Sequence, residues 1–183
     1  YHQLKNFDRS KVDMNSAGTD FEEDSLKRYY GAINFEAGVV KVVNRLVETG
    51  RRGILVFTRF VAEAKSLSEQ VPGAAFVCGD TPKKERDIIL RQFKAGKIPV
   101  VCNVGVLGIG FDYPELDTVL IARPTMSLAL FYQMVGRAMR PSAGKKDAMI
   151  VDMCGNISFF GPVEDLELCG EDTRTPYIRN KAG

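Results

Sequence analysis

The sequence predicts an α/β fold, a doubly wound and mostly parallel sheet flanked by helices. Short apolar runs of strand length recur along the chain, and the segments between them carry apolar residues at helical spacing. A continuous apolar run between two helices is typical of a parallel strand buried on both faces. Strands that alternate with helices at these lengths favour one doubly wound sheet. At 183 residues, 45% of them hydrophobic and 26% charged, the chain is long enough for one such domain.

The first part of the chain, residues 1–33, mixes charged residues, Gly and Asn without sustained periodicity. We interpret it as a linker or lead-in segment, with a short extended stretch and a helix around 22–29. The next segment, 35–49, has apolar residues at helical spacing, with Asn34 as a cap and Gly50 as a stop. The elements expected after it are a strand at 53–58 and a helix at 61–70.

The second half of the chain repeats this alternation. Thr81 and Pro82 form a cap and first-turn pair for a helix that stops at Gly96. A further helix is expected from Ser127 through Arg140. The expected strands lie at 74–78, 99–103, 118–121 and 148–152. Their carboxyl ends should share one edge of the sheet, where ligands gather in folds of this kind.

The pattern degrades after residue 156. We expect residues 157–183 to be a tail that packs on the domain or leads to a further module, which leaves 34–156 as the domain itself. The chain begins with Tyr1 rather than Met, so we expect it to be a piece of a longer protein.

Composition excludes several classes of protein. The net charge of +2 is near neutral, so any nucleic-acid surface must be a local patch. The four cysteines show no Cys-x-x-Cys spacing and the only histidine is His2, so we expect reduced thiols and no metal site. No run approaches the roughly 18 apolar residues of a membrane span, and no signal peptide is visible. A cytoplasmic protein is expected.

One polar stripe stands out in the helix expected to begin at Ser127. Gln133, Arg137 and Arg140 lie four and three positions apart, so they share one helical face. A guanidinium presents a planar fork of donors that matches phosphate oxygens. Two such groups one turn apart could bind the terminal phosphate of a nucleotide as negative charge develops on it. A solvated face with two surface arginines is the alternative.

Other candidates follow the predicted strands. Thr58 and Arg59 end one strand, Gly79 follows another and Asn103 ends a third. Hydroxyl, guanidinium, amide and exposed backbone groups suit contacts with phosphates, although each position could also be a simple turn. A glycine-rich loop then leads to Asp112, which could equally be a loop-capping residue.

These segments resemble the motifs of superfamily-two helicases and translocases. Gln-x-x-Gly-Arg-x-x-Arg at 133–140 is similar to motif six, which carries the arginine finger of the second RecA-like domain. The loop at 104–114 is similar to motif five, and 53–60 to motif four. Because the motifs occur in the expected order, the chain is identified as similar to a RecA-like helicase C-terminal domain.

The resemblance implies roles for individual residues. Arg137 and Arg140 would stabilise charge on the terminal phosphate of ATP, with Gln133 orienting the attacking water or the phosphate. Gly110 would offer backbone contacts to the nucleotide, and Asp112 would accept from the ribose hydroxyl. Contacts to the nucleic-acid backbone would come from Thr58, Arg59, Gly79 and Asn103.

The other half of an ATPase site is missing from the sequence. Gly-x-x-x-x-Gly-Lys-Ser/Thr does not occur, and no strand ends in a paired Asp-Glu that could hold Mg²⁺. ATP with Mg²⁺ would therefore be bound mainly by an absent N-terminal RecA-like domain, the expected partner. We expect no metal site in this chain, and no ATP hydrolysis by it alone.

The stretch from Gly79 to Asp152 is particularly similar to RadD-like bacterial DNA repair helicases, the YejH group. Gly-Asp-Thr-Pro, Arg-Pro-Thr and Asp-x-x-Gly-Asn occur there in the same order, and Asn103 fits that group. The resemblance implies a motor half that acts on DNA. We expect the DNA to be single-stranded or branched and this chain to be monomeric. A cysteine-rich zinc element of those relatives is not reproduced by Cys154 and Cys169. The alternatives are an RNA helicase half or a non-enzymatic module that binds nucleic acid or protein.

Overall fold

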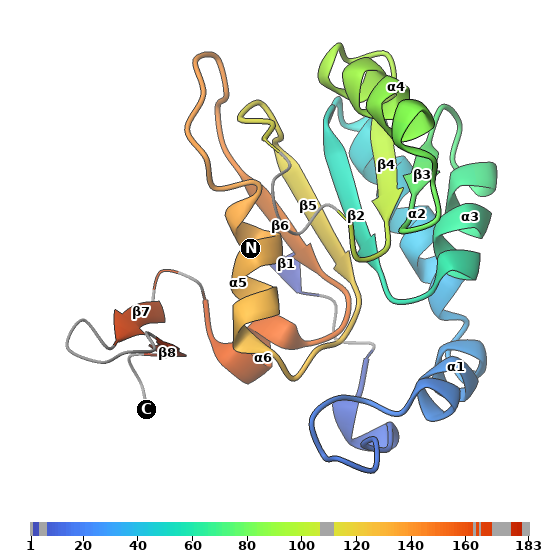
Figure 1. The fold of residues 1–183 in the computed structure, drawn as a ribbon, viewed down its shortest axis with the longest axis vertical. Helices are drawn as coiled ribbons and strands as arrows, with labels where there is room; N and C mark the ends of the chain where they lie inside the picture. The colour runs from blue at the N-terminus through green and yellow to red at the C-terminus, as the bar shows by residue number, and fades with distance from the viewer. Residues whose placement is uncertain are drawn as a thin grey trace.

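The computed structural model describes residues 2–3, 7–106, 112–162, 164, 166–169 and 177–180. The helices are α1 (Glu23–Ala32), α2 (Phe35–Glu48), α3 (Val61–Gln70), α4 (Lys83–Lys94), α5 (Leu128–Gly136) and α6 (Asn156–Phe160), with a short 3-10 helix η1 (Arg9–Lys11). The strands are β1 (His2–Gln3), β2 (Ile54–Thr58), β3 (Ala75–Val77), β4 (Val100–Asn103), β5 (Thr118–Ala122), β6 (Met149–Asp152), β7 (Leu166–Cys169) and β8 (Tyr177–Asn180). Figure 1 shows their arrangement.

The predicted fold class is confirmed. Within the described part of the chain, six strands form one sheet in the order β1-β6-β5-β2-β4-β3, and every neighbouring pair is parallel. The central strands β2, β4 and β5 are buried along their whole length, which explains their uninterrupted apolar sequences. β7 and β8 form a separate antiparallel pair within the predicted tail.

Helices cover both faces of this sheet (Figure 1). On one face, α1, α2 and α3 bury Leu26, Val39 and Leu67 against alternate residues of the strands. On the other face, α4 and α5 contribute Phe93 and Phe131 to a second core. Successive side chains of β2 point alternately into the first and the second core. The strand therefore packs against both helical layers, as a doubly wound sheet requires.

The lead-in segment, residues 1–33, contributes to the first core. Phe7, Val12 and Phe21 are buried there together with Leu26 and Tyr30. β1 adds a strand beside β6, and α1 is the helix expected around 22–29. The segment is thus bound to the domain along most of its described length.

Register places the candidate residues at one edge of the sheet. Phe57 lies beside Asn103, and Thr58 lies beside Ala122, immediately before Arg123. Asp152 at the end of β6 lies beside Ile121. The carboxyl ends of four strands therefore meet where the sequence predicted a ligand-binding edge.

Three local expectations are corrected. Asn34 occupies the cap position of α2, but its backbone is left-handed at φ 50° and its side chain makes no capping hydrogen bond. Pro82, rather than Thr81, is the cap of α4, because the Thr81 hydroxyl accepts a hydrogen bond from the Cys78 amide instead. α5 ends at Gly136 and does not continue through Arg140.

Among the described residues, no helix combines the length and apolar character needed to cross a membrane.

Candidate functional site

The site is built around α5, which begins close to the end of β5. Ser127 is its N-cap, and the Ser127 hydroxyl accepts a hydrogen bond from the Leu130 amide at 3.2 Å. Phe131, Met134 and Val135 are buried against the sheet. This packing leaves Gln133 half-buried and directs it to the carboxyl edge of the strands.

The three residues of the polar stripe do not form one helical face. Arg137 is the C-cap of α5 and keeps helical backbone angles, whereas Arg140 lies beyond the helix. Arg140 forms an ion pair with Asp112, which belongs to the loop after β4. The structure thus joins a residue of motif six to a residue of motif five, a pairing that helical spacing could not show.

Charge is concentrated at this end of α5. Burial lowers the pKa of the Arg137 guanidinium, and nearby Arg140 lowers it further, whereas Asp112 opposes both effects. The side chains of Arg140 and Asp112 are 46% and 68% exposed. An ion pair this exposed contributes about 0–1 kcal/mol to stability, so it does not by itself fix the position of Arg140.

Lys145 makes the stronger connection here. Its ammonium donates to the carbonyl oxygens of Arg140 at 2.8 Å and Pro114 at 3.2 Å, and to that of Ala138. Hydrogen bonds from a charged donor are worth about 1.5–3 kcal/mol each. This single side chain therefore ties the end of the motif-six segment to the loop that carries Asp112.

A small pocket of about 170 Å³ lies between α5 and the strand ends. Gln133, Asn103 and Arg123 share its lining with Gly105 and with apolar residues. The structure therefore brings together a residue of each of motifs five and six. Arg123 begins the Arg-Pro-Thr pattern, which the sequence analysis noted only as part of a resemblance.

Two of the residues that were predicted to contact the nucleic-acid backbone are buried. Thr58 is 1% exposed, and its hydroxyl donates to the Asn103 carbonyl oxygen at 3.4 Å. Asn103 is 0% exposed, and its side-chain oxygen accepts from the Val106 amide at 3.1 Å. In this state both side chains brace the strand ends and the start of the motif-five loop.

Two glycines also belong to the predicted site. Gly79 is exposed, and its backbone angles and surroundings would also accommodate a side chain. Gly110 lies outside the residues that the structure describes.

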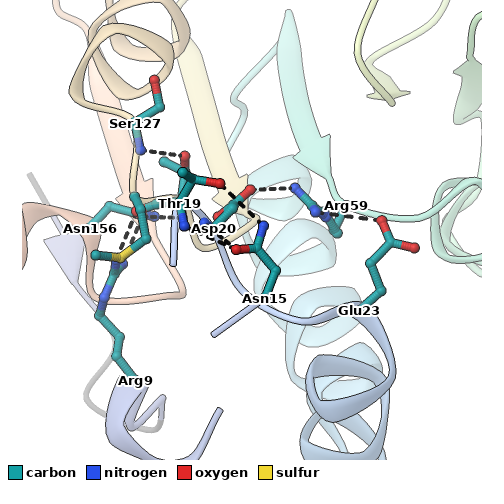
Figure 2. Close-up of polar contacts among 10 residues, drawn as sticks. Arg9, Asn15, Thr19, Asp20, Glu23, Arg59, Ser127 and Asn156 are labelled. Atoms are coloured by element: carbon teal, nitrogen blue, oxygen red, sulfur yellow. Dashed lines mark hydrogen bonds and ion pairs between the residues drawn. The ribbon is translucent and has the colours of Figure 1, made fainter. Parts of the chain in front are cut away.

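Arg59 faces acidic residues of the lead-in segment. Its guanidinium lies 2.8 Å from Asp20 and 3.5 Å from Glu23, as Figure 2 shows. Arg123 lies within electrostatic reach of the same group: burial lowers its pKa, Arg59 lowers it further, and Asp20 raises it. The Asp20 carboxylate is thus paired with the guanidinium that the sequence predicted to contact phosphates.

A second set of contacts joins the lead-in segment to the sheet edge (Figure 2). The Arg9 guanidinium donates to the Thr125 carbonyl oxygen at 2.7 Å and to the side-chain oxygen of Asn156 at 3.0 Å. Asn156 also accepts from the Thr125 amide, and its amide group donates to the Arg123 carbonyl and to Asp152. These bonds hold the loop between β5 and α5, and so the start of α5.

Sequence reasoning gave no role to Arg9, Asn156 or Lys145. Asn156 and Asp152 form the Asp-x-x-Gly-Asn pattern, which was noted as a resemblance but not explained. In the structure, Asp152 accepts hydrogen bonds from the amides of Cys154 and Ile157 and shapes this turn. Gly155 adopts φ 71°, which explains the glycine in the pattern. Arg9 carried no local signal, because its partners are more than 100 positions away.

No group of three or more His, Cys, Asp or Glu residues that could hold a metal ion occurs within the described ranges. Around the C-terminal end of α5, the polar groups are guanidinium, ammonium and amide groups together with the exposed carboxylate of Asp112. This set suits phosphate and hydroxyl groups better than a bare cation.

Comparisons with known proteins agree with the motif assignment. The family described as the helicase conserved C-terminal domain matches residues 38–142. A 51.5 kDa protein of a Lactococcus phage (isolate 7-9) is 34% identical over 155 residues, which is 83% of this chain and 33% of that protein. IRC3 of Saccharomyces cerevisiae, assigned as an ATP-dependent helicase, is 30% identical over 148 residues, which is 78% of this chain and 22% of that protein. The chain thus spans a third or less of these curated relatives.

Among solved structures, a fragment assigned as an HsdR subunit of a type I restriction enzyme from Vibrio vulnificus YJ016 aligns with a TM-score of 0.62. It is 21% identical, and the alignment covers 70% of this chain and 29% of that chain. At this identity the likeness bears on the fold alone.

Proposed function

Because this chain belongs to the helicase conserved C-terminal domain family of the superfamily-two helicases, we propose that it is the second motor domain of an ATP-dependent DNA helicase or translocase. The observation that carries the proposal is the cluster of Arg137, Arg140 and Asp112 at the end of α5. Two guanidiniums and a carboxylate in one place match the terminal phosphate and the ribose hydroxyl of a nucleotide.

In the proposed mechanism, ATP with Mg²⁺ is bound mainly by an N-terminal RecA-like domain, and it supplies the phosphoanhydride bond that is hydrolysed. Arg137 and Arg140 stabilise the charge that develops on the terminal phosphate, and Gln133 orients the phosphate or the attacking water. Asp112 accepts from the ribose hydroxyl. Because Arg140 and Asp112 are paired with each other here, nucleotide binding exchanges this ion pair for two contacts with the ligand.

Nucleic acid is proposed to cross the carboxyl edge of the sheet. Arg59 and the backbone at Gly79 contact phosphates, while Thr58 and Asn103 act from buried positions by holding the strand ends in place. Such contacts position a strand without reading its sequence. DNA is proposed over RNA because the motifs from Gly79 to Asp152 resemble RadD-like DNA repair helicases.

The proposed partners are the N-terminal RecA-like domain and single-stranded or branched DNA, in a monomeric cytoplasmic protein. Alone, the chain is proposed to hydrolyse no ATP, because its sequence contains no phosphate-binding loop. Closure and reopening of the cleft between the two domains would then move the protein along the strand.

The test is DNA-stimulated ATP hydrolysis by the full-length protein that contains this chain. Arg137→Ala and Arg140→Ala are each expected to lower turnover about 10³-fold or more, while ATP and DNA binding persist. Arg91→Ala is the control, because Arg91 is exposed on α4 and its guanidinium donates to the Asp87 carbonyl oxygen of the same helix. Single-stranded RNA of the same sequence, assayed in parallel, distinguishes a DNA motor from an RNA motor.

Unchanged turnover in both arginine variants would reject the catalytic role. Retained nucleic-acid binding would then favour a non-enzymatic binding module on the same fold.

A further inference from the structure

Lys145 lies at the junction of two segments that carry predicted nucleotide contacts. Its ammonium donates to the carbonyl oxygens of Ala138 and Arg140 on one side and of Pro114 on the other. The ammonium thus makes three hydrogen bonds, as many as a lysine can donate. Burial lowers the pKa of Lys145, whereas Asp117 and Glu115 raise it.

The local sequence brings Lys145 to this position by a tight turn. The Lys145 amide donates to the Ser142 carbonyl oxygen at 3.2 Å, and Gly144 adopts φ 85°. A positive φ of this size favours glycine, although a side chain at Gly144 would meet no atom within 4 Å. The turn reverses the chain after Pro141, so the Lys145 side chain returns to the residues just passed.

Arg140 depends on such a connection because the helix does not hold it. α5 ends at Gly136, and the backbone hydrogen bonds that close its last turn reach only Arg137 and Ala138. The ion pair of Arg140 with Asp112 is largely exposed. The Lys145 ammonium instead binds the Arg140 carbonyl oxygen directly and holds Pro114, two residues after Asp112.

We propose that Lys145 is a positioning residue that sets Arg140 relative to Asp112 for ATP hydrolysis, through its three carbonyl contacts. The inference rests on the proposed function and adds a residue to it. Lys145 touches neither nucleotide nor nucleic acid in this role. It fixes where the guanidinium of Arg140 is when the two motor domains close.

The test compares Lys145→Met with Lys146→Met in the full-length protein, with ATP hydrolysis measured at saturating single-stranded DNA. Both variants remove one positive charge, and Lys146 is the exposed neighbour. Lys145→Met is expected to lower kcat roughly 10- to 100-fold, the range for a displaced catalytic group. KM for ATP and the affinity for DNA should change less than about threefold, because Arg140 acts on the transition state.

A double variant separates positioning from a general effect on folding. If Lys145 acts through Arg140, adding Lys145→Met to Arg140→Ala lowers kcat little beyond Arg140→Ala alone. Lys145→Arg is expected to restore only part of the activity, because a planar guanidinium cannot direct three donors from one nitrogen. Gly144→Ala, which keeps the ammonium but strains the turn, is expected to lower kcat in the same way.

Three outcomes would overturn the inference. The first is that Lys145→Met and Lys146→Met have equal kcat values while Arg140→Ala is inactive. This result would reject the role of Lys145 and leave the proposed function intact. The second is a multiplicative loss in the double variant, as expected of two independent effects. The third is full activity of Arg140→Ala, which rejects the proposed role of Arg140 together with the inference.

Discussion

Glu63 shows how a half-buried carboxyl couples the stability of this fold to pH. It lies in the first turn of α3, and its side chain accepts a hydrogen bond from the Phe60 amide at 3.1 Å. Burial raises its pKa from 4.5 to about 7, and the nearby Glu36 adds to this, while backbone hydrogen bonds from Phe60 and Arg59 oppose it. The folded protein therefore holds a proton on Glu63 that the unfolded chain releases near pH 4.5.

This difference predicts the effect of Glu63→Gln on stability. Because the unfolded state binds fewer protons between pH 4.5 and 7, the free energy of unfolding falls as pH rises through this window. The neutral amide of Gln avoids the penalty and can still accept from Phe60. At pH 8, Glu63→Gln is expected to be more stable than the unsubstituted protein by on the order of 3 kcal/mol at most.

Urea unfolding at pH 4.5, 6 and 8 measures this difference. The gap between the two proteins should close at the lowest pH. Glu69→Gln, at an exposed position of the same helix, serves as the control and should show no such convergence. A gap that is independent of pH would show that the pKa of Glu63 does not differ between the folded and the unfolded state.

Residue types at the site could be predicted, but their pairings could not. Gln133, Arg137 and Arg140 were recognised from spacing on one helix. The ion pair of Arg140 with Asp112 depends on where the helix ends and on a loop 28 positions earlier in the chain. Lys145 carried no signal in the sequence, because its acceptors are backbone carbonyl oxygens, which any sequence provides.

At the scale of elements, the central strands and the bounds of α2, α3 and α4 were predicted closely, whereas the end of α5 was not. Apolar runs mark the strands because both faces of β2, β4 and β5 are buried. α5 ends at Gly136, five residues before Pro141. This end was not predicted, because Arg137 and Arg140 continue the helical spacing beyond the last helical turn. The lead-in segment lacked periodicity, because its buried residues Phe7, Val12 and Phe21 lie outside its helices and strands.

The contact between the lead-in segment and the end of β2 predicts the effect of Asp20→Asn. If Arg59 contacts phosphates, the Asp20 carboxylate competes with them for its guanidinium. Removing that charge is expected to tighten binding of single-stranded DNA roughly fivefold, which corresponds to the upper range of about 1 kcal/mol for a partly exposed ion pair. The salt dependence of binding should also steepen, because one more phosphate contact releases more counterions.

Asp24→Asn is the matched control for this prediction. It makes the same change in charge in the same segment, but Asp24 is an exposed residue whose ion pair is with Lys27. Fluorescence anisotropy of a labelled oligonucleotide at several salt concentrations compares the two variants. Equal affinities would mean that only net charge matters and that Arg59 does not contact the strand.

At the scale of the whole molecule, the lead-in segment and the carboxyl edge of the sheet stabilise each other. Arg9 binds Thr125 and Asn156, and its guanidinium also lies over the rings of Phe21 and Phe159 at 4.9 and 4.3 Å. One side chain thus connects three separate parts of the chain.

Arg9→Met is therefore expected to lower the free energy of unfolding by about 2–4 kcal/mol, since it leaves partly buried acceptors without a donor. Lys11→Met, at an exposed position of the same 3-10 helix, should change stability by less than about 0.5 kcal/mol. Thermal unfolding followed by circular dichroism measures both. Equal melting temperatures for the two variants would show that the lead-in segment is held by its apolar residues alone.

The placement of β1 also bears on the order in which the chain can fold during synthesis. β1 lies beside β6, so His2 has its neighbour Val151 only after almost the whole domain has left the ribosome. Arg9 likewise cannot form its hydrogen bond with Asn156 until that residue has been synthesised. Long-range parallel pairing of this kind forms slowly. The part of this chain that is made earliest is therefore completed last, and its apolar side chains stay accessible to chaperones until then.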